Sequence, residues 1–324
     1  MCNFFLLLLQ EIDESPIIAT YLSLTIGSFA TILVPYFKAV AHHGKRLNNT
    51  YTKVKEKEIG EVSLLDKFNL ITIPKYYFIF MYLFSLICCS IVIYCHLKSK
   101  NMNDNALGLL WRNQPLIILF SFHSLRRFLE CIYITIYGTS VMHLIGFIVG
   151  LTHYAITVLN LANKQIYAAK SEYDIDYIAH DSSLHTHLYL PHSIKYLALL
   201  LFIFASIMQH RFHMILYRIK YKQVTLKKAD EDEDQDKDHP SLFRYEVPRG
   251  SWFQYCCCPH YTSEILIYIS LVSLHPDPTS WYMLLWVVSN LAVVAMDTLR
   301  WYQSHAQLRN QIPRHWKALI PGVF

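Results

Sequence analysis

Long apolar runs constrain this chain more than any other feature, because a helix needs about 20 mostly apolar residues to cross a lipid bilayer. Seven runs of this kind, some of them shorter or interrupted by polar residues, occupy residues 17–39, 77–97, 115–137, 141–161, 194–216, 263–274 and 281–301. The sixth run is short and spans only if residues 255–260 extend it. Charged residues make up only 16% of the chain, which excludes an ordinary soluble domain. The predicted fold class is therefore an all-α, polytopic integral membrane protein with seven transmembrane helices.

Basic residues predict the orientation, since cytosolic loops carry an excess of Lys and Arg. Residues 1–16 contain acidic but no basic side chains, whereas basic residues crowd the loop that follows the first run. We therefore predict a lumenal N-terminus at 1–16 and five membrane helices within 17–216. A cytosolic loop at 217–262 with an acidic insertion at 230–238 follows, then two more helices within 263–301. A cytosolic tail at 302–324 completes the predicted organisation.

Ionisable side chains inside membrane helices are costly and usually mark a site. His123, Arg126, Arg127 and Glu130 are spaced i, i+3, i+4 and i+7, so a helix presents them on one face. Such a stripe could bind an anion and polarise a carbonyl group. The alternative is two arginines that reach toward the interface, with a structural Arg–Glu pair.

Three further polar clusters lie toward the predicted cytosolic side of the membrane. Gln209 and His213 share one helical face, and His260 and Glu264 share another. We expect no metal at the second pair, because no third ligand stands at a suitable spacing. The basic and aromatic tail that includes Lys317 is typical of a membrane anchor, and it could also reach a phosphate-bearing ligand.

Several function classes are disfavoured by the same sequence. A net charge of +5 is too small to predict a nucleic-acid partner. The chain has neither a G-x-G-x-x-G nor a Walker A motif, so any nucleotide would bind between helices. A receptor is disfavoured, because no Asp-Arg-Tyr closes the third run and the last run lacks Asn-Pro-x-x-Tyr. A transporter is disfavoured, because matched Gly or Pro breaks in corresponding halves are missing.

Seven short motifs occur in a fixed order along the chain. They are Gly44-Lys45, Ile73-Pro74-Lys75-Tyr76-Tyr77-Phe78, His123-Ser124-Leu125-Arg126-Arg127, Gln209-His210-Arg211, Val247-Pro248-Arg249-Gly250, Pro259-His260-Tyr261 and Lys317-Ala318-Leu319-Ile320-Pro321. With this set the chain resembles the steroid 5α-reductase family, and most closely its polyprenal reductase branch. The resemblance runs from about residue 43 to the C-terminus.

The resemblance implies an NADPH-dependent reductase of the endoplasmic reticulum membrane. Its substrate would be polyprenal, a long isoprenoid whose α,β double bond is reduced during dolichol biosynthesis for protein N-glycosylation. Hydride would reach the β-carbon while His123 polarises the carbonyl, with Glu264 as a second catalytic candidate. A steroid or an enoyl lipid is the alternative substrate within the family. The partners would be the isoprenoid substrate and the lipid bilayer, with no nucleic acid and no metal, and the resemblance leaves protein partners open.

The resemblance also implies a set of cofactor-binding residues: Arg126, Arg127, Gln209, His213, Lys220, Tyr245, His260, Glu264 and Lys317. Two positions depart from the family pattern, since Glu246 and Trp316 stand where a basic residue is usual. The family's carboxylate on the second span has no clear equivalent here.

Overall fold

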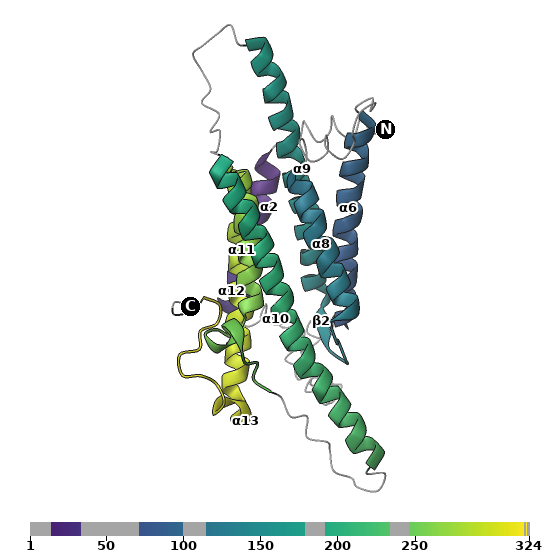
Figure 1. Ribbon diagram of the computed structural model, residues 1–324, viewed down its shortest axis with the longest axis vertical. Coiled ribbons are helices and arrows are strands. Elements are labelled where there is room, and N and C mark those ends of the chain that lie inside the picture. Colours follow the sequence, from purple (N-terminus) through teal and green to yellow (C-terminus); the bar gives the residue numbers. More distant parts are fainter. Residues whose placement is uncertain are drawn as a thin grey trace, which may run out of the picture.

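The computed structural model describes residues 14–33, 71–99, 115–178, 192–233, 246–320 and 322. Its long helices run side by side along one axis (Figure 1). They are α2 (Glu14–Leu33), α6 (Phe78–Ser99), α8 (Pro115–Tyr133), α9 (Leu144–Ile178), α10 (His192–Glu233), α11 (Pro259–Leu274) and α12 (Pro278–Ser304). The short helix α13 (Ala306–Arg309) and the 3₁₀ turns Lys75–Tyr77 and Ser251–Gln254 complete the helical elements of these ranges.

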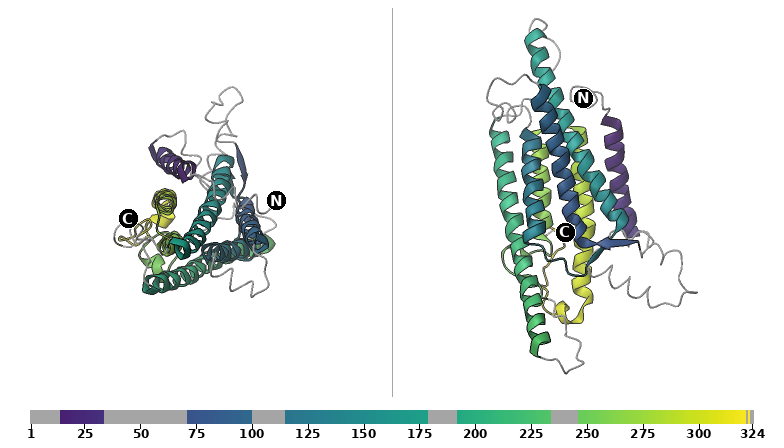
Figure 2. Two further views of the ribbon diagram at one scale, coloured as in Figure 1. Left: turned by 90° about the horizontal axis from the view of Figure 1, so that it is seen from above. Right: turned by 90° about the vertical axis from the view of Figure 1, so that its right-hand side faces the viewer.

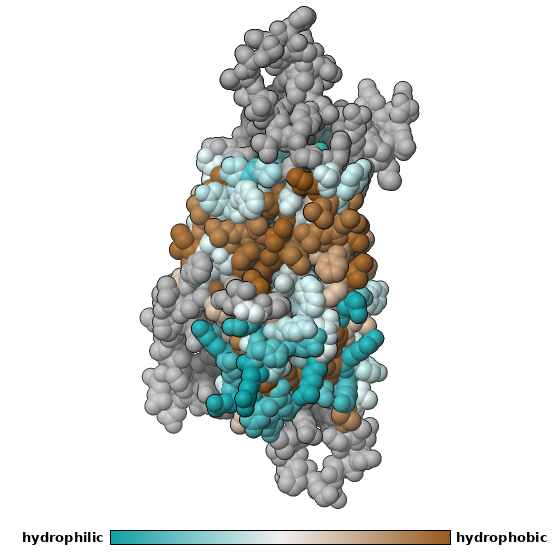
Figure 3. Space-filling model, turned by 60° about the vertical axis from the view of Figure 1, so that its left-hand side comes forward, coloured by the Kyte–Doolittle hydropathy of each residue, from teal (hydrophilic) through white to brown (hydrophobic). Residues whose placement is uncertain are grey.

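Four of the described helical segments are long and apolar enough to cross a membrane: Lys75–Lys98, Leu144–Ala162, Ser193–Leu226 and Pro278–Ser304. Large apolar side chains such as Ile91, Phe122 and Leu200 are exposed on the outside of the bundle. On the face shown in Figure 3, hydrophobic residues form a band with a hydrophilic zone below it. The predicted class of helical membrane protein agrees with these features, while the count of seven spans stays a prediction.

Two helices are longer than the sequence predicted. The predicted loop at 217–262 is wrong over its first part, because α10 continues to Glu233. The prediction of a span at 141–161 also missed that α9 continues to Ile178. Neither extension contains Gly or Pro, and each includes residues that favour helix, mainly Ala in α9 and Lys in α10. The apolar runs end where a helix would leave the bilayer, but the residues that follow still favour helix, so α9 and α10 continue beyond the runs.

The N-terminal ends of two helices carry residues suited to those positions. Pro259 stands in the first turn of α11, where its missing N–H costs nothing and its fixed φ favours helix. Asp277 caps α12 by accepting the backbone N–H of Ser280 at 3.1 Å and its hydroxyl at 2.6 Å. Helix α11 begins one turn before the run 263–274, within the extension at 255–260 that the sequence required for a sixth span.

A two-stranded antiparallel sheet is a small exception to the all-α prediction. Strand β1 (Thr72–Pro74) pairs with β2 (Val141–His143), with Thr72 opposite His143 and Pro74 opposite Val141. The sheet ties the start of α6 to the start of α9. Close packing continues above it, because a Cβ on Gly150 would lie only 2.7 Å from the sulfur of Met81.

The helices are not evenly packed. Seen from above in Figure 2, α2 lies at one side of the group, where it contacts α12 and α9. The most extensive contact joins α10 to α11, which carry the polar clusters predicted at Gln209 and Glu264.

The C-terminal tail packs against the segment that leads into α11. Cys256 and Lys317 form a parallel β-bridge, and the hydroxyl of Thr262 donates to the carbonyl of Leu319 at 2.7 Å. The indole N–H of the buried Trp316 donates to the carbonyl of Phe253 at 2.5 Å. The tail therefore fixes the start of α11.

Candidate functional site

A cavity of about 710 Å³ lies between the helices, which falls within the usual range for small-molecule sites. Its wall is formed by residues of α2, α6, α8, α9, α10, α11 and α12. The polar and aromatic side chains that line it include Lys75, Tyr82, Arg127, His153, Gln209, His213, Lys220, His260, Glu264, Tyr268 and Trp286. Six of the predicted site residues are thus brought together from three helices.

Glu130 joins the basic side chains around it into one cluster, which is buried except for the 46% exposed side chain of His210. Its two oxygens lie 2.7 Å from Arg126 Nη1, 2.5 Å from Arg127 Nη1, 2.9 Å from His210 Nδ1 and 2.7 Å from His213 Nδ1. The carboxylate is only 3% exposed, so its charge is balanced by protein groups rather than by water. The structural Arg–Glu pair that the sequence left open is therefore present.

Gln209 connects three helices through its side-chain amide. Its oxygen accepts from Arg126 of α8, and its nitrogen donates to Oε2 of Glu264 of α11. An amide is suited to this place, because it offers an acceptor to the guanidinium and a donor to the carboxylate. The connection leaves Glu264 at the cavity wall with both oxygens engaged.

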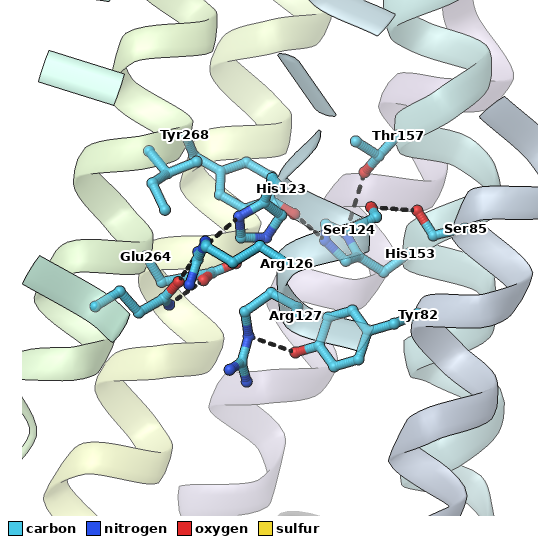
Figure 4. A network of polar contacts seen from close by, with 12 residues as sticks. Tyr82, Ser85, His123, Ser124, Arg126, Arg127, His153, Thr157, Glu264 and Tyr268 are labelled. Atoms are coloured by element: carbon cyan, nitrogen blue, oxygen red, sulfur yellow. Dashed lines mark hydrogen bonds and ion pairs between the residues drawn. The ribbon is translucent and has the colours of Figure 1, made fainter. Parts of the chain in front are cut away.

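His123 lies behind Glu264 rather than at the cavity. Its ring is fully buried, and its Nε2 lies 3.2 Å from Oε1 of Glu264 (Figure 4). It is not among the residues that line the cavity. His123 therefore contacts the site through Glu264, and its predicted role as a direct donor to a carbonyl stays a prediction.

One end of the cavity is basic. Arg127, Lys75 and Lys220 all line it, and each comes from a different segment of the chain. Lys220 donates to the backbone carbonyl of Ile136, which holds its ammonium group at the wall. These three cations outnumber the two carboxylates near Arg127, Glu130 and Glu264, so this end suits an anionic ligand such as a phosphate group.

The other end is aromatic, with His153, Tyr154, Tyr268 and Trp286 in its wall. The ring of Phe120 packs behind it, 6.3 Å from Tyr268 between centroids. The sequence analysis missed this group. Its signals were present, since His153 interrupts an apolar run and Tyr268 follows Glu264 by one helical turn.

Three predicted residues lie elsewhere. Arg126 is held by Glu130 and Gln209 and does not line the cavity. Lys317 belongs to the tail, where its backbone N–H donates to Tyr255. Tyr245 lies outside the described residues. Among the part of the chain that the structure describes, no group of His, Cys, Asp or Glu could hold a metal.

The cysteines before α11 have a structural place. Cys256, Cys257 and Cys258 are all buried beside the C-terminal tail. Burial raises the pKa of the Cys256 thiol to about 12, so it stays protonated at neutral pH. A protonated, buried thiol is neither a nucleophile nor an accessible acylation site.

Comparison with known proteins adds a family to this geometry. Residues 154–324 match the family model described as 3-oxo-5-alpha-steroid 4-dehydrogenase. This match covers α10, α11, α12 and the tail, which supply much of the cavity wall.

Several relatives carry the name polyprenal reductase. The one from Xenopus tropicalis is 32% identical, over 68% of this chain and 60% of its own length. Polyprenal reductase 1 from Oryza sativa subsp. indica is 29% identical, over 66% of this chain and 59% of its own length. The Homo sapiens relative is 22% identical over 96% of both chains. The family model covers more than half of this chain. The chain therefore belongs to the 3-oxo-5-alpha-steroid 4-dehydrogenase family, which is the steroid 5α-reductase family that its motifs resembled.

Proposed function

We propose that this protein is an oxidoreductase that uses NADPH to reduce the α,β double bond of polyprenal in dolichol biosynthesis for protein N-glycosylation. The observation that carries the proposal is one cavity with a basic end and an aromatic end. The basic end suits the phosphates of a dinucleotide, and the aromatic end suits an isoprenoid aldehyde. The names of the relatives from Xenopus tropicalis and Homo sapiens support the choice of substrate.

The residues of the cavity fit the proposed cofactor. Arg127 and Lys220 offer charge-assisted hydrogen bonds to phosphate oxygens. His260 offers a polar group, since its buried Nδ1 has no hydrogen-bond partner among the described residues. Bound there, NADPH would supply the hydride that the reduction needs. Arg126, Tyr245 and Lys317 remain in the proposed cofactor set on the family resemblance alone.

Glu264 is the proposed link between the cavity and the polar groups behind it. Its carboxylate faces His123 on one side and Gln209 on the other, and it lines the cavity between the two ends. We assign Glu264 and His213 to cofactor binding. For His123 we propose a positioning role in place of the direct donor role predicted from the sequence, because it reaches the cavity only through Glu264.

The proposed setting is the endoplasmic reticulum membrane with seven spans. Helices α2, α8 and α11 would add three crossings to the four apolar segments, since they lie alongside them in Figure 1. The charge pattern supports a lumenal N-terminus and a cytosolic C-terminus. In this topology the basic end of the cavity opens toward the cytosol. The cytosolic loop before α11 starts after Glu233 instead of at residue 217.

A substrate comparison tests the proposal. Purified protein in detergent micelles would receive NADPH with either a polyprenal or an enone steroid, and products would be identified by mass spectrometry. We expect reduction of polyprenal with a much higher kcat/KM than of the steroid. Preference for the steroid would support the alternative substrate class within the family. A folded sample that binds NADPH yet reduces neither compound would contradict the proposed substrate, and one that does not bind NADPH would contradict the reductase.

A further inference from the structure

A hydrogen-bonded trio of side chains lines the aromatic end of the cavity, one helical turn beyond Glu264. Tyr268 of α11 lies with its hydroxyl 2.8 Å from Nε2 of His153 of α9. Nε1 of Trp286 of α12 lies 3.1 Å from Nδ1 of the same histidine. All three residues line the cavity, and Figure 4 shows the Tyr268 hydroxyl pointing toward the ring of His153.

The hydrogen-bonding capacity of each group fixes the direction of these bonds. An indole N–H can only donate, so Nδ1 of His153 must accept from Trp286. A neutral imidazole with an accepting Nδ1 carries its proton on Nε2. That Nε2–H must therefore donate to the Tyr268 oxygen. The hydroxyl hydrogen of Tyr268 is then left to donate, and the described residues offer it no acceptor.

We propose that Tyr268 is the hydrogen-bond donor that polarises the substrate's carbonyl oxygen, and that His153, held by Trp286, keeps it in that role. The assignment rests on the proposed function. As hydride adds to the β-carbon, the electron pair of the double bond moves toward the carbonyl oxygen. The Tyr268 O–H stabilises the negative charge that develops there, and a proton from water completes the α-carbon. A donor preorganised in a water-poor cavity is effective for this step.

The other polar groups of the cavity are less suited to the carbonyl. Glu264 is a carboxylate beside Arg127 and Gln209, so its charge would repel a developing oxyanion. Tyr82 accepts from Nε of Arg127 at 3.2 Å and stacks under that guanidinium, which places it at the basic end assigned to the cofactor. Tyr268 is better suited than either, because its hydroxyl lies in the aromatic region where an isoprenoid aldehyde would lie and its hydrogen has no acceptor among the described residues.

The test removes one oxygen atom. Tyr268→Phe is expected to lower kcat for polyprenal about 10²- to 10³-fold, as loss of an oxyanion donor does elsewhere. The affinity for NADPH should be unchanged, while the Kd of the saturated aldehyde should rise up to about tenfold for one lost hydrogen bond. Tyr282→Phe on α12 is the matched control, because Tyr282 does not line the cavity. It should keep kcat within about twofold of the wild-type value.

The role of His153 is tested by two replacements. His153→Gln keeps a donor and an acceptor, so it should restore much of the activity that His153→Leu loses. A structural role alone would not produce that rescue. A second measurement uses wild type alone, so it does not depend on whether the variants fold. The infrared C=O stretching frequency of the saturated aldehyde should be lower when it is bound to the protein than when it is in micelles without protein.

The assignment of Tyr268 would be overturned if wild type were active and folded Tyr268→Phe had the same kcat. It would also be overturned if the carbonyl stretching frequency did not shift on binding. A folded wild type that reduces no polyprenal would instead overturn the proposed function, and the Tyr268 assignment with it. The two failures are distinguished by the wild-type reaction alone.

Discussion

At the scale of single residues, contacts with buried charged groups determine the roles of the polar side chains on one face of α8. Sequence spacing placed His123, Arg126, Arg127 and Glu130 on one face correctly, but it could not divide their roles. The division depends on partners from another helix, above all Gln209 and His213 of α10. Those contacts engage Arg126 inside the protein and leave Arg127 at the cavity. Long-range partners of this kind are not visible in helical periodicity.

Glu130→Gln should strongly destabilise the protein. The change removes a buried negative charge and leaves Arg126, Arg127 and two histidines without their shared counter-ion. Breaking a buried pair in this way costs about 3–5 kcal/mol. The measurement is the midpoint of thermal unfolding in detergent.

The matched control is Glu246→Gln, which breaks an exposed pair with Lys222 at 3.3 Å. Exposed pairs contribute about 0–1 kcal/mol, so its midpoint should stay close to wild type. Equal midpoints for the two variants would contradict the role given to Glu130.

Cys256 should resist alkylation in the folded protein. Its pKa of about 12 lies about three units above pH 9, so about one thiol in a thousand is ionised at that pH. Below pH 9 the reactive fraction falls further, and burial blocks access as well. Peptide mass spectrometry after maleimide treatment should find Cys256 modified only in denatured samples. Labelling of the folded protein at pH 8 would refute this placement.

At the scale of elements, the C-terminal tail and α11 act as one unit. The motif Lys317-Ala318-Leu319 was recognised in the sequence, but its purpose was not. The structure gives it one, because backbone groups of Lys317 and Ala318 accept from Cys257 and Cys258 at the entrance to α11. Trp316, which departs from the family pattern, packs its ring 5.6 Å from that of Tyr302.

Trp316→Arg should therefore destabilise the protein, although it installs the residue type that the family favours. The indole is 5% exposed and donates to Phe253, so a guanidinium there would be buried without a carboxylate partner. Trp316→Phe keeps the ring and should lose only about 1 kcal/mol for the missing hydrogen bond. The thermal midpoint of both variants and their NADPH affinity would be compared. A more stable Trp316→Arg would show that the departure is not compensated by this packing.

At the scale of the whole molecule, the sequence was most informative about the fold class and least informative about the aromatic end of the cavity. Apolar runs located the helices within a few residues, because bilayer thickness sets their minimum length. They could not predict where α9 and α10 end, since those ends lie beyond the apolar stretch. Of the basic end of the cavity, Arg127 was predicted from charges in an apolar run and Lys220 from the family resemblance, whereas Lys75 was not predicted as a site residue. The aromatic end was missed, because Tyr and Trp in a membrane helix look like ordinary apolar or interfacial residues.

The central claim is that this cavity brings a reduced nicotinamide to a conjugated aldehyde. The most direct measurement supplies polyprenal with NADPH that carries deuterium at the transferable position of its nicotinamide ring. We predict one deuterium at the β-carbon of the saturated product and one solvent-derived hydrogen at the α-carbon. Deuterium that appears at the carbonyl carbon instead, with the double bond intact, would contradict the account.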